Sequence, residues 1–174
     1  TDPEASPEQI EAFRPQTGKN GPLEAEGFVQ PYCDSPMDNE TVGEHVYLNL
    51  IGSATEYVWI YTPYLIIDNE MQTALCTAAK RGVDVRIVTP GIPDKKMAFR
   101  LTRSYYPVLL RAGVKIYEYT PGFIHAKSFV SDDRIGVVGT INLDSSTMTS
   151  VGTMLANGKA YLSTDPYIIF FPAL

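Results

Sequence analysis

Long apolar runs and cysteines are both scarce in this chain of 174 residues. No stretch approaches the roughly 18 consecutive apolar residues that cross a bilayer, and the start lacks a basic segment followed by an apolar one. The only cysteines, Cys33 and Cys76, lie far apart and without the spacing of metal ligands. We therefore expect a soluble or peripheral chain of a cytosolic compartment, with reduced, buried thiols and neither a disulfide framework nor a zinc site.

An excess of basic residues is missing too. The formal net charge is -6, and residues 1–50 hold ten acidic residues against Arg14 and Lys19, so the remainder of the chain is slightly basic. General nucleic-acid binding depends on dense Lys and Arg contacts to phosphates. The composition therefore predicts no nucleic-acid partner, and the basic remainder leaves room for a pocket that binds one phosphate.

The pattern along the chain predicts a single α/β domain. Residues 1–26 are rich in Pro, Gly and acids and are interpreted as a linker or leader, so the folded part begins near Gly27. Beyond it, strand and helix signals alternate as in βαβ units on a mostly parallel sheet. The expected strands are 27–33, 56–62, 83–89 and 114–120, and the expected helices are 41–54, 69–80 and 94–112.

Three of these helices carry specific expectations. In the first, Thr41 is a plausible N-cap. In the second, Asp68 is the expected cap, and the third is expected to be interrupted at Pro107. The apolar stripe expected along the first helix is Val42, Val46, Leu48 and Leu50.

An antiparallel hairpin is expected at residues 123–142, because only Asp132 and Asp133 separate two strand-like runs. If these two residues form the turn, residue 127 pairs with 138 and residue 125 with 140. Directly paired residues point to the same face of a sheet, and the side-chain period along a strand is two. The hairpin therefore predicts one face that carries His125, Lys127, Thr140 and Asn142.

That grouping suits a phosphodiester substrate. A neutral histidine can attack phosphorus covalently, and a lysine and an asparagine can donate hydrogen bonds to the oxygens on which charge accumulates. Asp132 lies in the turn and is given a structural role. An isolated His-x-Lys is usually an ordinary polar pair. His45, beside Glu44, is likewise expected to be an ordinary polar residue. The longer pattern from His125 to Asn142 makes coincidence implausible.

The pattern H-x-K-x4-D-x6-G-[ST]-x-N resembles the signature of the phospholipase D superfamily. The matching residues are His125, Lys127, Asp132, Gly139, Thr140 and Asn142. The resemblance implies a phospholipase D-like mixed sheet flanked by helices and a chemistry that needs no metal or other cofactor. It also implies that His125, Lys127 and Asp132 form the catalytic motif, with Lys127, Thr140 and Asn142 binding the substrate phosphate.

Wider stretches resemble the second half of bacterial cardiolipin synthases. They are EGFVQPYCDSPMDNE, YVWIYTPYLIIDNEM, AAKRGVDVRIVTPGIPDKK and AGVKIYEYTPGFIHAKSFVSDD, and the resemblance covers about residues 25–144. It implies transfer of a phosphatidyl group between two phosphatidylglycerol molecules through a phosphohistidine, with His125 as the nucleophile or the general acid/base. It also implies work on anionic phospholipid at the bacterial cell membrane, on the cytoplasmic side or peripherally.

The chain departs from that family in three ways. It carries one motif where the family combines two, so the second half is expected from a preceding segment or from a homodimer. The family's amino-terminal transmembrane helices are missing as well, so the chain is interpreted as a carboxy-terminal fragment. Residues 145–174 lack the family's aromatic-Arg-Ser sequence and its glutamate-bearing strand. This divergent tail is interpreted as the result of a frameshift or of a truncated and altered gene end. Residues 27–144 are then the expected catalytic half-domain.

Two other functions stay open. One is a homodimeric phosphodiesterase or nuclease of the same fold, and the other is an inactive fragment that binds phospholipid. Tyrosines between Tyr57 and Tyr64 could line a lipid-facing cleft or pack in the core. The cations Lys95, Lys96, Arg100 and Arg103 could meet an anionic bilayer or form a solvated helix face.

Overall fold

The centre of the fold is a mixed β-sheet. The computed structural model describes residues 27–32 and 40–144 and, further on, the strands at 153–157, 160–162 and 169–171. The seven strands of the sheet are, in spatial order, β1 (Phe28–Tyr32), β9 (Thr153–Asn157), β7 (Ile135–Gly139), β6 (Ser128–Ser131), β2 (Tyr57–Tyr61), β4 (Asp84–Pro90) and β5 (Lys115–Tyr119). Two short pairs accompany it, β3 (Leu65–Ile66) with β8 (Leu143–Asp144) and β10 (Ala160–Leu162) with β11 (Ile169–Phe171).

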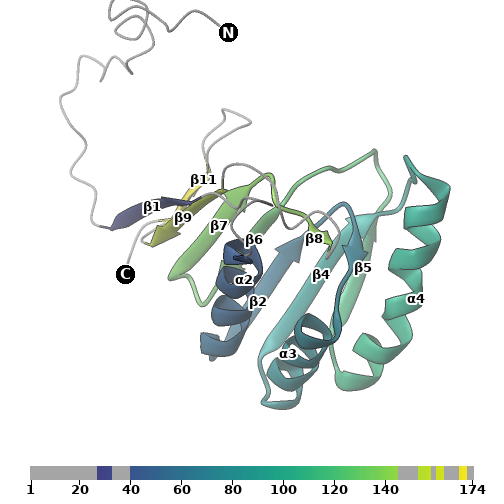
Figure 1. The fold of residues 1–174 in the computed structure, drawn as a ribbon, viewed down its shortest axis with the longest axis horizontal. Helices are drawn as coiled ribbons and strands as arrows, with labels where there is room; N and C mark the ends of the chain where they lie inside the picture. The colour runs from purple at the N-terminus through teal and green to yellow at the C-terminus, as the bar shows by residue number, and fades with distance from the viewer. Residues whose placement is uncertain (1–26, 33–39, 145–152, 158–159, 163–168, 172–174) are drawn as a thin grey trace, which may run out of the picture.

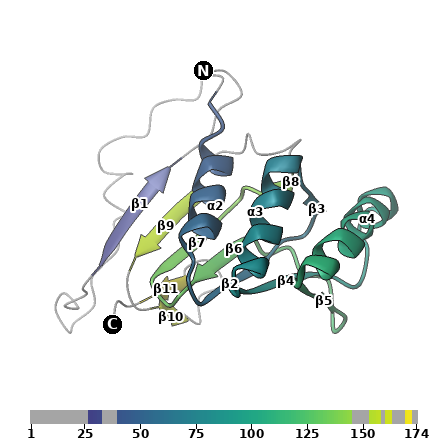
Figure 2. The same cartoon turned by 90° about the horizontal axis from the view of Figure 1, so that it is seen from below.

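The connections confirm the expected βαβ units. Strands β2, β4 and β5 are parallel. The crossovers between them contain α3 (Asn69–Lys80) and α4 (Lys96–Ala112), and α2 (Val42–Ser53) precedes β2. Figures 1 and 2 show α2 and α3 lying across the same face of the sheet, with α4 beside the β5 end. Parallel strands all end at one edge of a sheet, so the loops that follow β2, β4 and β5 are brought together there.

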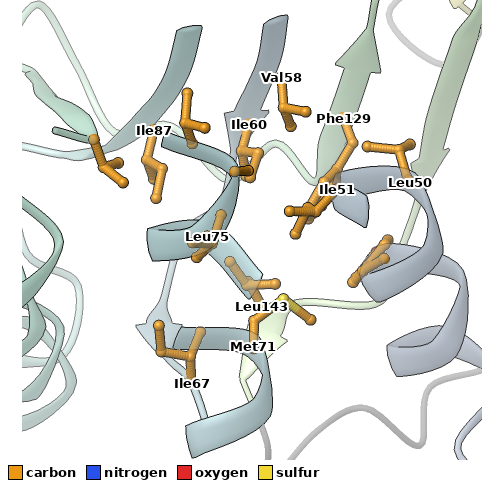
Figure 3. Close-up of a cluster of buried hydrophobic side chains, with 14 of the residues drawn as sticks. Leu50, Ile51, Val58, Ile60, Ile67, Met71, Leu75, Ile87, Phe129 and Leu143 are labelled. Carbon is orange, nitrogen blue, oxygen red and sulfur yellow. The ribbon is translucent and has the colours of Figure 1, made fainter. Parts of the chain in front are cut away.

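The core lies between the sheet and the helices that cover it. Along β2, Val58 and Ile60 are fully buried and alternate with half-exposed neighbours, as the period of two requires. Phe129 of β6 stacks on Tyr47 of α2 with ring centroids 4.0 Å apart. The side chains that close this core in Figure 3 include Leu50, Ile51, Ile67, Met71, Leu75, Ile87 and Leu143.

The stripe expected on α2 was only partly right. The structure buries Gly43, Tyr47, Leu50 and Ile51, which recur at the helical spacing of three or four. Val42, Val46 and Leu48 lie at intermediate exposure on the flanks of this stripe. The large Tyr47 side chain decides the rotation of the helix, because it buries its ring and also donates its hydroxyl to the carbonyl of Ile141 at 2.9 Å.

Of the two side-chain N-caps that were expected, the structure shows one. The carboxylate of Asp68 accepts a hydrogen bond from the amide of Met71 at 2.8 Å and caps α3. Thr41 occupies the N-cap position of α2, where its side chain makes no capping hydrogen bond. The interruption expected at Pro107 was wrong, because α4 runs through it. The exposed ring of Pro107 removes one backbone hydrogen bond, and buried residues on either side of it, Thr102 and Leu109, keep the helix packed.

The hairpin of β6 and β7 is present, with a register one residue away from the expected one. Asp132 and Asp133 do form the turn, both at φ 53°, and the amide of Arg134 donates to the carbonyl of Ser131 at 2.9 Å. The ladder then pairs Ser131 with Ile135. Arg134 is therefore an extra residue in the loop, so position 127 lies opposite 139 where 138 was expected.

The remaining expectations concern the chain outside this core. The linker at 1–26 and Cys33 lie outside the described residues, and Cys76 is a free, half-buried thiol. Of the tail, β9 pairs with β7 and β1 in the sheet. In the described part of the chain, no helix combines the length and the hydropathy needed to cross a membrane.

Candidate active site

His125 and Lys127 lie in the segment that connects β5 with β6, just beyond the carboxyl ends of the parallel strands. The Nζ atom of Lys127 is 2.6 Å from Nδ1 of His125 and donates to the carbonyl oxygen of His125 at 2.9 Å. The amide of Gly139 donates to the carbonyl of Lys127 at 3.2 Å and ties this segment to the end of β7. The two residues of the His-x-Lys pair therefore form one hydrogen-bonded unit.

The protonation of this pair follows from its surroundings. Partial burial, together with the positive charge of Lys127, holds the pKa of His125 below its ordinary value. The carboxylate of Asp94 acts in the opposite direction and Lys95 in the same direction as Lys127. Burial also lowers the pKa of Lys127. At neutral pH the imidazole is therefore uncharged, which is the form that can act as a nucleophile or a base.

Aromatic rings surround the imidazole. The ring of Tyr64 meets the ring of His125 edge to face at 6.1 Å, and the ring of Phe123 lies tilted at 5.8 Å from it. The Tyr64 hydroxyl donates to Asp94, and the ammonium of Lys95 lies over the Tyr64 ring at 5.7 Å from its centroid. These contacts join the loops after β2, β4 and β5 around His125.

Thr140 and Asn142 reach the same end of the sheet by another route. Ile141 is buried, and its carbonyl accepts the Tyr47 hydroxyl. The amide of Leu143 donates to Oγ1 of Thr62 at 3.3 Å, and that hydroxyl donates to the carbonyl of Tyr64 at 2.6 Å. The backbone before Asn142 is thus fastened to α2, and the backbone after it is fastened to the segment that carries the Tyr64 ring.

The observed hairpin register differs from the one expected to bring Thr140 and Asn142 to the face of His125. The β6–β7 ladder ends at the pair Ser128 and Val138, before the motif residues are reached. In the observed register position 140 falls opposite 126, which has the other parity from His125 and Lys127. The register from which a shared face was derived is therefore wrong, and both the common face of the four residues and the phosphate-binding roles of Thr140 and Asn142 stay predictions.

The structure brings Asp132 to the other end of β6, away from His125. One carboxylate oxygen accepts from the amides of Glu56 and Tyr57 at 2.9 and 2.8 Å, and the other accepts from the amide and hydroxyl of Thr55 at 2.7 and 2.9 Å. Burial alone would raise the pKa of Asp132, and the hydrogen bonds from Tyr57, Thr55 and Glu56 outweigh it and lower the pKa. Asp132 fastens the β6–β7 turn to the start of β2, which agrees with the structural role expected for it.

The structure also brings Tyr64, Asp94 and Lys95 to His125, a link that was not expected from the sequence. The signal was available, because all three follow the carboxyl ends of parallel strands, where ligands bind in open α/β sheets. As for metals, the described residues contain no group of three or more His, Cys, Asp or Glu side chains that could hold an ion.

Known proteins resemble this chain in sequence. Residues 47–156 match the family described as the cardiolipin synthase, PLD-like domain. A chain of Streptococcus mutans named only as an uncharacterized protein is 62% identical over 120 residues, which make up 69% of this chain and 26% of that protein. A protein of Geobacillus sp. strain WCH70 named cardiolipin synthase is 45% identical over 121 residues, covering 70% of this chain and 24% of the relative.

The fold is also found among solved structures. The phospholipase D family member Nuc from Salmonella typhimurium superposes with a TM-score of 0.63 at 23% identity, covering 76% of this chain and 84% of Nuc. This likeness concerns the fold. The chain spans about a quarter of the length of the curated relatives that it matches. With the match over residues 47–156, the chain belongs to the cardiolipin synthase, PLD-like domain family of the phospholipase D superfamily.

Proposed function

We propose that this chain is one catalytic half of a cardiolipin synthase-type phosphatidyltransferase. In this role it transfers a phosphatidyl group from one phosphatidylglycerol to another through a phosphohistidine. The observation that carries the proposal is the 2.6 Å contact between Nζ of Lys127 and Nδ1 of His125, in a segment that the family match includes. A nucleophilic or basic nitrogen and a cation for phosphate oxygens are what phosphodiester transfer requires.

The reaction proceeds in two displacements. In the first, a ring nitrogen of one histidine forms a bond to phosphorus while the bond from phosphorus to the leaving glycerol oxygen breaks, and the glycerol takes a proton from the partner histidine. In the second, a hydroxyl of the second phosphatidylglycerol bonds to phosphorus, the phosphorus–nitrogen bond breaks, and the hydroxyl proton returns to the partner histidine. His125 fills either the nucleophile or the acid/base position, and the second motif fills the other.

Lys127 has two positions in this scheme. With its ammonium donating to Nδ1, the proton of the neutral imidazole sits on Nε2. A bound phosphate diester competes for the same ammonium through its anionic oxygens. When Lys127 turns to the phosphate, Nδ1 can take the proton and Nε2 can present its lone pair to phosphorus. Burial lowers the pKa of Lys127 because it disfavours the charged ammonium. A buried ammonium is stabilised when it donates to an anionic oxygen such as that of a phosphate.

The surroundings of His125 suit a lipid substrate. Met97 is 80% exposed in the first turn of α4, two residues after Lys95, and Phe123 is 47% exposed two residues before His125. Lys96 and Arg100 are exposed on the first turns of α4. Apolar side chains beside cations fit the boundary between headgroups and acyl chains of an anionic phospholipid membrane. The proposal therefore places the site at the bacterial cell membrane surface.

The second motif comes from outside this chain, either from a preceding segment of a longer protein or from a second copy. Phosphatidyl transfer measured on vesicles of phosphatidylglycerol tests both sources. One arm uses the chain alone, and the other uses the chain combined with an amino-terminal segment that carries the other motif.

Cardiolipin and free glycerol should form in at least one arm, and His125→Ala should abolish both products. In the arm without the added segment, activity from a homodimer should rise more steeply than linearly with chain concentration. Product formation that His125→Ala leaves unchanged, or an absence of transfer in both arms, would rule the proposal out. Cleavage of a soluble phosphodiester in place of lipid transfer would instead favour a phosphodiesterase.

A further inference from the structure

The loop between β4 and α4 is held firmly against the site. The amide of Gly91 donates to the carbonyl of Tyr119 at 2.8 Å, so this loop lies on the end of β5. A Cβ atom at position 91 would come within 2.9 Å of that oxygen, so the close approach requires glycine. Asp94 accepts the hydroxyl of Tyr64 through one carboxylate oxygen and the amide of Lys95 at 2.7 Å through the other.

This fastening fixes where Lys95 can reach. Its ammonium lies 5.7 Å from the centroid of the Tyr64 ring, and the edge-to-face partner of the same ring is His125 at 6.1 Å. The Tyr64 ring therefore contacts both groups. The charge of Lys95 also lowers the pKa of His125, which places its ammonium within electrostatic reach of the imidazole.

Lys95 stands in a different position from Lys127. Lys127 is in direct contact with His125, whereas Lys95 reaches His125 through the Tyr64 ring. A phosphoryl group bonded to His125 has Lys127 as its adjacent cation. An anion that meets Lys95 lies beside the same Tyr64 ring that contacts His125.

An acceptor phosphatidylglycerol has such an anion. Its attacking hydroxyl must reach the phosphorus on the histidine, and three carbons of glycerol separate that hydroxyl from the acceptor's own phosphate. We propose that Lys95, positioned by Asp94 and Tyr64, binds the phosphate of the acceptor phosphatidylglycerol while His125 and Lys127 engage the phosphoryl group being transferred. This inference rests on the proposed function and makes Lys95 a determinant of specificity for an anionic acceptor.

Two soluble probes separate the two phosphate positions. Deacylated phosphatidylglycerol carries one phosphodiester, and deacylated cardiolipin carries two that are joined by glycerol. Titration calorimetry on the complete 174-residue chain measures the affinity for each probe. Lys95→Gln is the test variant, and Lys96→Gln is the matched control because it removes the same charge from the next exposed residue.

The chain should bind the probe with two phosphodiesters about tenfold more tightly than the probe with one, the range expected for one charge-assisted contact. Lys95→Gln should remove this preference and leave affinity for the single phosphodiester unchanged, and Lys96→Gln should keep the preference. A preference that survives Lys95→Gln, or an equal loss of affinity for both probes, would overturn the inference.

The proposed function fails in a different way. If Lys127→Gln leaves the affinity for the single phosphodiester unchanged, the assignment of the phosphoryl site to His125 and Lys127 is wrong, whatever Lys95 does. If the unaltered chain binds neither probe, the inference about Lys95 is wrong, and the proposed function is decided by the transfer assay.

Discussion

The ammonium of Lys127 lies 2.6 Å from Nδ1 of His125, so the two charged or titratable groups of the motif are in direct contact. The positive charge of Lys127 disfavours protonation of the ring, so it adds to the effect of burial in lowering the pKa of His125. The same contact makes the imidazole sensitive to any change at position 127. The first prediction follows from this coupling.

Lys127→Gln should raise the pKa of His125, because it removes the nearest positive charge while most of the burial remains. An NMR titration of the imidazole resonances measures the pKa directly. Lys80→Gln, at the far end of α3, removes the same charge and should leave the titration unchanged. An unchanged His125 titration in Lys127→Gln would show that the contact is absent in solution.

Asp132→Asn should destabilise the fold by about 2 to 4 kcal/mol, because the carboxylate accepts four hydrogen bonds and an amide cannot accept them all. Asparagine tolerates the positive φ of this turn, so the substitution isolates the carboxylate. Urea unfolding measures the loss. Asp133→Asn is the control. The Asp133 side chain accepts one exposed hydrogen bond, from the Tyr57 hydroxyl, so this substitution should lower the free energy of unfolding by less than about 1 kcal/mol.

Stability should fall as pH rises from about 4.5 to about 7 through Glu44. A hydrogen bond to Asp68, with burial and the charge of Asp68, raises the pKa of Glu44 from 4.5 to about 7 in the folded chain. The folded state therefore keeps a proton that the unfolded state has lost over this range, and the free energy of unfolding decreases. After allowance for solvent screening, we expect a loss of about 1 kcal/mol.

Glu44→Gln should remove that decrease, because glutamine does not titrate. Urea unfolding at pH 5 and pH 8 compares the variant with the unaltered chain, and Glu56→Gln, at an exposed site between α2 and β2, is the control. A pH dependence that is identical in Glu44→Gln would contradict the assignment to this carboxyl.

Tyr64→Phe should loosen the loop that precedes α4. It removes the hydroxyl that donates to Asp94 and retains the ring beside His125. Amide hydrogen exchange at Lys95 and Phe99 should quicken by about tenfold, as expected for the loss of one hydrogen bond to a carboxylate. Tyr61→Phe, on the exposed side of β2, should leave these amides unaffected. Equal exchange in both variants would show that the Tyr64–Asp94 contact does not hold the loop.

The sequence predicted the βαβ units and the hairpin because their signals are local. Strand periodicity, the Asp68 cap and the turn at Asp132 and Asp133 each depend on neighbours in the chain. The hairpin register was wrong by one residue, since the extra loop residue Arg134 is decided by how both strands pack on β2 and β9. The rotation of α2 was also set by a distant partner, the stacking of Tyr47 on Phe129.

By itself, the sequence determined the chemical groups of the site and the family. His125, Lys127 and the spacing that leads to Asn142 are fixed by covalent order. Only the tertiary structure decided that Tyr64, Asp94 and Lys95 join His125, because parallel strands far apart in the chain bring their carboxyl ends to one edge. The tertiary structure also decided that Asp132 stabilises the turn. Strand β6 separates the Asp132 carboxylate from the imidazole, and three backbone amides donate to the carboxylate oxygens.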